Sequence, residues 1–203
     1  MKFNLPKEKS NIIKVVGVGG GGGNAVNHMH NQGINGVDFI ICNTDQQALD
    51  MSPINNRIQL GETLTDGLGA GSNPETGRNS AIESIDHIKE VLGKGTKMVF
   101  ITAGMGGGTG TGAAPVIAKA SRDLDVLTVG IVTMPFAFEG RKRRLQAEEG
   151  IQQMRENVDT LLVINNDKLR EIYGNLAVHE AFAQADNVLT TAAKGIAETI
   201  TRV

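Results

Sequence analysis

The sequence predicts an α/β fold with three layers, in which a mostly parallel sheet carries helices on both faces. Short apolar, β-branched segments alternate with segments of helical periodicity along the 203 residues. Short links separate them, which is typical of βαβ units. Glycine is also unusually abundant, with 26 residues, and much of it directly follows predicted strands. Ligands of such sheets bind at the carboxyl ends of the strands, so we expect the functional site at that edge.

The first half of the chain is predicted to form three strands and two helices. The run at residues 12–18 (IIKVVGV) has the apolar character of a strand buried on both faces. Asn24 and Pro74 are typical residues for helix starts. In chain order we expect a strand at 12–18, a glycine run at 19–23, a helix at 24–31, a strand at 37–43, a short strand at 57–60, a glycine-rich loop at 66–72 and a helix at 74–92.

The second half continues the alternation and ends in a long amphipathic helix. We expect a strand at 98–103, a glycine run at 104–112, a helix at 113–122, a strand at 126–133, a helix at 141–158, a strand at 160–164, a short helix at 168–173 and a helix at 178–203. The last helix has no terminal Gly, Asn or Pro stop signal, so we expect a chain cut from a longer protein. The predicted division is an N-terminal extension at 1–10, a binding domain at 11–178 and a central helix at 179–203.

The composition argues against several classes of partner. Lys and Arg total 20 and Asp and Glu total 22, which gives a net charge of −2, so we expect no nucleic-acid partner. No run of 18 apolar residues occurs, so we expect no direct membrane insertion. A single cysteine, Cys42, and an N-terminus without an apolar signal region favour a cytoplasmic location.

The glycine runs have the chemistry of phosphate cradles. Without Cβ atoms the backbone can direct successive N–H groups at one anion, and the helix that follows adds the positive end of its dipole. This arrangement is predicted twice, at 19–23 and at 104–112, and the loop at 67–71 offers further donors. One phosphate needs only one such loop, so several indicate a di- or triphosphate.

The residues alone leave the kind of nucleotide open. Residues 17–22 satisfy GxGxxG, and Asp45 follows the second strand as a candidate ribose acceptor, so a dinucleotide-binding oxidoreductase domain is an alternative. That alternative gives the second glycine run no role. A Walker A P-loop is excluded, because GxxxxGK[ST] occurs nowhere in the sequence.

The second glycine run carries a more specific signal. Residues 106–112 read GGGTGTG between a predicted strand and a predicted helix, and in this form and context they resemble the signature of the tubulin/FtsZ family of GTPases. Further segments resemble the FtsZ branch of that family in order and spacing: KVVGVGGGGGNAVN at 14–27, NTDQQAL at 43–49, GLGAGSNPETGR at 67–78, FITAGMGGGTGTGAAPV at 100–116, PFAFEGRKR at 135–143, NDKL at 166–169 and ADNVL with GIAETI within 185–200. The resemblance implies the family's Rossmann-like nucleotide-binding fold.

The resemblance also implies which residues bind GTP or GDP. The base is expected at Asp186, whose carboxylate would accept from the guanine N1–H and amine, with Phe182 packing on the ring. The implied phosphate contacts are Gly20, Gly21, Gly22, Ala70, Gly71, Ser72, Gly107, Gly108, Thr109 and Gly110; the implied ribose contacts are Glu139 and Arg143; and the other implied base contacts are Asn24 and Asn166. Mg²⁺ would be held through phosphates and water, with no protein ligand.

The family resemblance implies a mechanism that this chain does not complete alone. In the family, subunits stack head to tail into the cytokinetic ring at the bacterial division site, and an NxDxxD-type loop of one subunit activates hydrolysis in the next. No NxDxxD occurs in these residues, so we expect no catalytic residue here, nucleotide binding with almost no hydrolysis, and adaptor binding through a C-terminal tail beyond Val203. A filament cap without catalysis is a further alternative.

Overall fold

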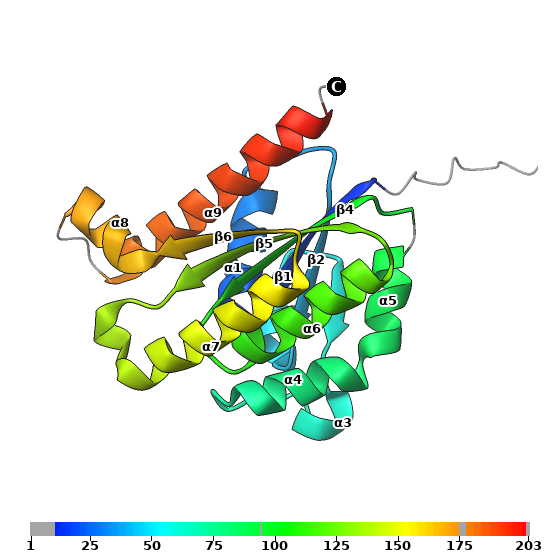
Figure 1. Ribbon diagram of the computed structural model, residues 1–203, viewed down its shortest axis with the longest axis horizontal. Helices are drawn as coiled ribbons and strands as arrows, with labels where there is room; N and C mark the ends of the chain where they lie inside the picture. The colour runs from blue at the N-terminus through cyan, green and yellow to red at the C-terminus, as the bar shows by residue number, and fades with distance from the viewer. Residues whose placement is uncertain (1–10, 94, 175–177, 202–203) are drawn as a thin grey trace, which may run out of the picture.

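The computed structural model describes residues 11–93, 95–174 and 178–201, so the predicted extension at 1–10 lies outside it. The predicted α/β fold class is confirmed (Figure 1). The strands are β1 (Ile13–Val18), β2 (Asp38–Asn43), β3 (Asn56–Gln59), β4 (Met98–Gly104), β5 (Leu127–Met134) and β6 (Thr160–Asn165). The helices are α1 (Gly19–Asn31), α2 (Gln46–Asp50), α3 (Glu62–Thr65), α4 (Pro74–Glu83), α5 (Ile85–Gly93), α6 (Thr109–Asp123), α7 (Arg141–Asn157), α8 (Asn166–Tyr173) and α9 (Val178–Thr201), with a 3-10 turn, η1, at Ala137–Glu139.

The sheet positions one edge for ligand binding. Its strand order is β3-β2-β1-β4-β5-β6, and every neighbouring pair is parallel. The order of connection reverses between β1 and β4, which is where open α/β sheets place their ligand crevice. The helices that follow these two strands are α1 and α6, so both glycine runs begin at this point.

Two apolar cores hold the layers together, one on each face of the sheet. The first joins the sheet to α4, α5, α6 and α7 through residues such as Ile101 and Ile117. The second joins it to α1 and α9 through residues such as Phe100, Met29 and Leu189. Figure 1 shows α9 on the side of α1, across the sheet from α6 and α7. The predicted three-layer arrangement is therefore present.

Two helices begin earlier than the sequence predicts. The predicted starts were residues 24 and 113, whereas α1 begins at Gly19 and α6 at Thr109. Glycine has a low helix propensity of its own, but tertiary packing overrides it here. A Cβ on Gly22 would lie 2.3 Å from the Thr102 carbonyl oxygen, so the glycines let α1 lie against β4. The glycine runs therefore form helix N-termini as well as loops.

The predicted helix at 74–92 is two helices, α4 and α5, separated at Ser84. The start at Pro74 is as predicted, and Asn73 caps it by accepting from the Glu75 N–H. The Ser84 hydroxyl accepts from the Gly61 N–H at 3.1 Å and donates to the Gln59 carbonyl at 3.4 Å, so the junction between the two helices is bonded to the segment around the end of β3. Ile82, which was predicted on the apolar face, is 47% exposed, because the buried face of α4 consists of Gly77, Ser80 and Ala81.

Three short elements were not predicted, namely α2, α3 and η1. Helix α2 is capped by the Asp45 carboxylate, which accepts from the Ala48 N–H at 3.1 Å. Elements of this length carry too few apolar positions to show a period. Of the helices in the described part of the chain, none has the length and apolar character needed to cross a lipid bilayer.

Candidate nucleotide-binding site

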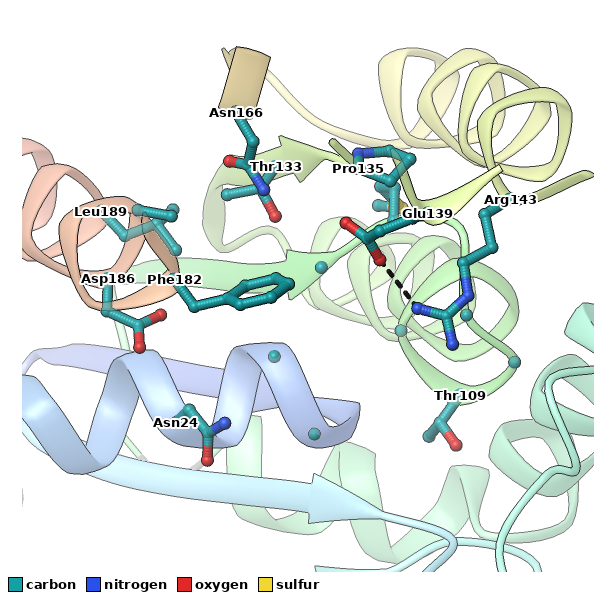
Figure 2. A pocket seen from close by; sticks show the side chains of 18 residues that line it. Asn24, Thr109, Thr133, Pro135, Glu139, Arg143, Asn166, Phe182, Asp186 and Leu189 are labelled. Atoms are coloured by element: carbon teal, nitrogen blue, oxygen red, sulfur yellow. Dashed lines mark hydrogen bonds and ion pairs between the residues drawn. The ribbon is translucent and has the colours of Figure 1, made fainter. Parts of the chain in front are cut away.

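A cavity of about 470 Å³ opens at the carboxyl ends of β1 and β4, a size typical of small-ligand sites. All but four of the predicted site residues line it: Gly20, Gly21, Asn24, Gly107, Gly108, Thr109, Gly110, Glu139, Arg143, Asn166, Phe182 and Asp186. Figure 2 shows their side chains converging from α1, α6, α7, α9 and the ends of the strands. The remaining four, Gly22, Ala70, Gly71 and Ser72, do not line the cavity.

The end of the cavity formed by α1 and α6 suits anions. Neither helix has a side-chain cap at its first turn, so their leading N–H groups lack the usual side-chain acceptor. The two N-termini touch, since a Cβ on Gly19 would lie 2.8 Å from the Gly110 nitrogen. Added Cβ atoms at Gly20 and Gly107 would meet open space. Two positive helix ends therefore point at one open volume.

The loop that carries Ala70, Gly71 and Ser72 packs next to the end of the cavity that is formed by α1 and α6. A Cβ on Gly108 would lie 2.8 Å from the Ala70 Cβ, so the loop packs on the first turn of α6. Ser72 has φ +60°, an uncommon conformation for a residue with a side chain. Its carbonyl accepts from the Gln146 Nε2 at 3.4 Å. The loop borders the anion end without lining the cavity.

Thr109 lines the cavity and has a buried partner. Its hydroxyl lies 2.6 Å from the hydroxyl of Thr44, at the end of β2. Thr44 is fully buried and does not line the cavity. A side-chain hydrogen bond thus joins the first residue of α6 to the residue that follows β2.

Glu139 and Arg143 form a fixed polar pair on one wall (Figure 2). The Glu139 Oε2 lies 2.7 Å from the Arg143 Nη1, and its Oε1 accepts from the Phe136 N–H at 2.8 Å. Glu139 has a side-chain exposure of 12%, whereas Arg143 has 49%. The carboxylate is therefore held in place, and the guanidinium keeps donors available at the cavity mouth.

The opposite wall carries the aromatic group. Phe182 projects from α9 into the cavity (Figure 2), and its ring meets Phe136 edge to face at a centroid distance of 5.1 Å. Phe136 also stacks on Phe138 at 5.0 Å. Because Phe182 is 41% exposed, one face of its ring remains available for a planar ligand.

Asp186 lies next to Phe182 on the same face of α9, close to α1 (Figure 2). Burial raises the pKa of its carboxyl from 3.8 to about 6, and the positive charge of His28 offsets part of this. His28 also bonds the adjacent Asn187, with 2.6 Å between its Nε2 and the Asn187 Oδ1. This bond fastens α9 to α1 beside Asp186. A ligand that donates to the carboxylate would favour its ionised form.

Asn166 carries a buried polar atom without a partner. The residue is 3% exposed, and within the described part of the chain its Oδ1 accepts no hydrogen bond. A buried polar atom left unpaired costs about 1–3 kcal/mol. Since Asn166 lines the cavity, a ligand with a hydrogen-bond donor would remove this cost.

Sequence reasoning missed several lining residues. They are Gly104, Met105, Thr133, Pro135, Ala185 and Leu189. The first four lie in the last residues of β4 and β5 or directly after them, which the strand assignment alone could have indicated. Ala185 and Leu189 lie three and seven positions after Phe182, so helical spacing places them on the same face of α9.

Cys42 and Asp45, two polar groups outside the cavity, are each explained without a reactive role. Burial raises the pKa of the Cys42 thiol to about 12, so it stays protonated at neutral pH. The Asp45 carboxylate, the candidate ribose acceptor of the dinucleotide alternative, caps α2 and does not line the cavity. Among the described residues, no group of three His, Cys, Asp or Glu side chains is placed to hold a metal ion.

Known proteins agree with this architecture. The GTPase domain of the Tubulin/FtsZ family matches residues 12–174. The cell division protein FtsZ of Porphyromonas gingivalis is 59% identical over 93% of this chain and 42% of its own length, and that of Pseudomonas putida is 55% identical over 98% and 50%. A structure of the FtsZ dimer of M. jannaschii superposes with a TM-score of 0.91 at 44% identity, over 97% of this chain and 57% of that one.

The chain thus spans about half the length of the curated relatives it matches. The match covers both glycine runs, the Glu139–Arg143 wall and Asn166. The family match favours a GTPase domain over the dinucleotide-binding alternative, which was based on residues 17–22 and Asp45. The chain belongs to the Tubulin/FtsZ family of GTPase domains.

Proposed function

We propose that this chain binds GTP and GDP in the cavity between α1, α6 and α9. The observation that carries the proposal is the division of the cavity into two ends of different chemistry. One end presents two uncapped helix N-termini, and the other is lined by Phe182, Asp186 and Asn166. A nucleotide has the same division, with anionic phosphates at one end and a planar base with donors at the other.

The phosphates are proposed to lie on Gly20, Gly21, Gly107, Gly108 and Gly110. Backbone N–H groups at helix starts bind anions without a charged side chain. The predicted contacts of Gly22, Ala70, Gly71 and Ser72 remain proposals. Gly22 packs on β4 in the described structure, so its contribution would be through its backbone N–H, while the loop at 70–72 would need to close over the terminal phosphate.

The base is proposed to stack on Phe182 and to donate to Asp186. A carboxylate accepts from both the N1–H and the amine of guanine, whereas adenine presents an acceptor at its N1 position. Asn166 and Asn24 add amide groups at the same end. Glu139 and Arg143 then face the sugar, the former as an acceptor and the latter as a donor.

Mg²⁺ is proposed to be held by phosphate oxygens and water. No trio of suitable side chains exists in the described residues, and this ion commonly keeps its waters while binding substrate phosphates. The ion would neutralise phosphate charge. The protein groups would bind and orient the nucleotide.

The test is competition for a fluorescent GTP analogue bound to the nucleotide-free chain. GTP and GDP should displace it, whereas ATP and NAD should not at comparable concentrations. An Asp186→Asn variant tests the role of the carboxylate. The Asn amide can also donate to the adenine N1, so the preference of the chain for GTP over ATP should become smaller. Displacement by ATP as effective as displacement by GTP would refute the assignment of Asp186.

We also propose that the full-length protein hydrolyses GTP in a head-to-tail polymer in the cytoplasm, at the division site. The 203 residues contain no NxDxxD motif, so a polypeptide of these residues alone should release phosphate at a negligible rate. Its nucleotide face would bind one end of a filament of intact subunits, which makes capping a second candidate role, and adaptor proteins would bind elsewhere on the full protein. Phosphate release at the rate of an assembled full-length relative would contradict the proposal.

A further inference from the structure

We propose that Thr44, which lies outside the cavity, is a positioning residue that sets the first turn of α6 for phosphate binding. This inference rests on the proposed function. Thr44 joins three segments that meet at the anion end, namely the end of β2, the loop before α4 and the start of α6. Its effect on the nucleotide would be exerted through Thr109.

The side chain of Thr44 forms a hydrogen bond with the side chain of Thr109. The two hydroxyl oxygens are 2.6 Å apart, Thr44 is fully buried, and Thr109 is 9% exposed. A pair of this length in a buried site is a well-formed hydroxyl hydrogen bond. It fixes the side chain of the residue at which α6 begins.

The backbone of Thr44 is held on both sides. Its N–H donates to the Asn43 Oδ1 at 2.9 Å. Its carbonyl accepts from the Gly69 N–H at 3.1 Å and from the Thr65 hydroxyl at 3.3 Å. The loop that packs on Gly108 through Ala70 is therefore anchored on the same residue that holds Thr109.

The number of hydroxyl protons determines which of Thr44 and Thr109 donates to the other when a nucleotide binds. A hydroxyl has one proton to donate and two lone pairs that accept. If Thr109 donated to Thr44, it would have no proton for a phosphate oxygen. If Thr44 donates to Thr109, the Thr109 proton remains free for the ligand, and each bond polarises the next. Serine at position 44 could take the same donor role, whereas valine has no polar hydrogen to donate.

The test compares Thr44→Val, which keeps the shape and loses the hydroxyl, with Thr44→Ser, which restores it. The loss of one neutral hydrogen bond is expected to weaken GDP binding about two- to tenfold, and Thr44→Ser should recover most of the loss. Binding of guanosine, which has no phosphate, should be unchanged in both variants. Guanosine binding weakened as much as GDP binding would show a general structural defect and overturn the inference.

Thr128→Val is the matched control for stability. Thr128 is also fully buried and donates to the Ser121 hydroxyl at 2.9 Å, but it lies near the start of β5, at the other end of the strand from Thr133. This variant should lower the melting temperature as Thr44→Val does, while GDP binding stays at the wild-type level. If Thr128→Val lost as much GDP affinity as Thr44→Val, the loss in both variants would follow from lower stability, and the positioning role of Thr44 would be refuted.

A double-mutant cycle then separates an action through Thr109 from an independent one. In the background of Thr109→Val, adding Thr44→Val should not weaken GDP binding further, because the same bond is already gone. Additive losses would overturn the proposed route. A wild-type chain that fails to bind GDP would refute the proposed function itself, whereas a wild-type chain that binds GDP no better than Thr44→Val would refute only the role of Thr44.

Discussion

Replacing Gly22 by alanine tests whether the glycines of α1 are needed for close packing on the sheet. An added Cβ would lie 2.3 Å from the Thr102 carbonyl oxygen, where ordinary contacts begin near 3.4 Å. The obstructing atoms are backbone atoms of β4, which cannot rotate away. Helix and strand must therefore separate by about 1 Å, which a close-packed interior resists.

The expected cost combines two opposing effects. Overpacking of this kind costs about 1–3 kcal/mol, and the better helix propensity of alanine offsets up to about 1 kcal/mol. We expect Gly22→Ala to be about 2 kcal/mol less stable than wild type, which corresponds to a fall of about 4–8 °C in melting temperature for a chain of this size.

The matched control is the next residue of the same helix. A Cβ on Gly23 would meet nothing within 4 Å, so Gly23→Ala should gain helix propensity without a clash. Its melting temperature should rise by about 2 °C. Both variants are measured by thermal unfolding followed by circular dichroism, and GDP affinity is measured in parallel.

Nucleotide binding should follow the same ranking. A displaced α1 moves Gly20, Gly21 and Asn24 away from the cavity, so GDP affinity should fall in Gly22→Ala and stay near wild type in Gly23→Ala. Equal melting temperatures for the two variants would show that α1 does not lie as close to β4 as described, and the packing argument would be wrong.

Four further outcomes are expected at the base end. Burial raises the pKa of Asp186 to about 6, and only the ionised carboxylate accepts from both guanine donors. The affinity for GDP should therefore fall about tenfold per pH unit below about pH 6. In Asp186→Asn this pH dependence should be absent. Without ligand, the raised pKa of Asp186 adds to the free energy of unfolding. This contribution is fully present below the ordinary pKa of 3.8 and is lost as pH rises through about 6. Urea unfolding at several pH values measures it. Phe182→Ala should weaken GDP binding by about 1–3 kcal/mol, whereas Phe138→Ala, which removes a 53% exposed ring outside the cavity, should leave competition titrations unchanged. Asn166→Leu should weaken GDP binding without lowering the melting temperature, since it removes an unpaired buried oxygen.

The sequence predicted the layers of the fold better than the edges of its elements. Buried strands such as β1 and β4 are apolar along their length, so periodicity and composition identify them. The start of α1 depends on how closely the chain approaches Thr102, and the Ser84 hydroxyl at the junction of α4 and α5 is bonded to Gln59 and Gly61. Such contacts join residues distant in sequence, and a local pattern does not contain them.

The candidate site shows the same difference. The glycine runs predicted an anion site because two of them stand between a strand and a helix, where backbone N–H groups bind anions. The proposed role of Thr44 could not be predicted, since its hydroxyl meets that of Thr109 only once the fold brings the residue after β2 to the start of α6. Asp186 was indicated by resemblance, but its raised pKa follows from burial between α1 and α9, which only the folded chain shows.

The bond between His28 and Asn187 joins residues 159 positions apart, and this separation has a consequence for biosynthesis. The phosphate end is complete once α6 has folded, but Phe182 and Asp186 leave the ribosome only near the end of these 203 residues. Closing so long a loop delays the contact between α1 and α9. A nascent chain would therefore hold a half-built cavity between the synthesis of α6 and that of α9, and guanine selectivity would appear after phosphate binding.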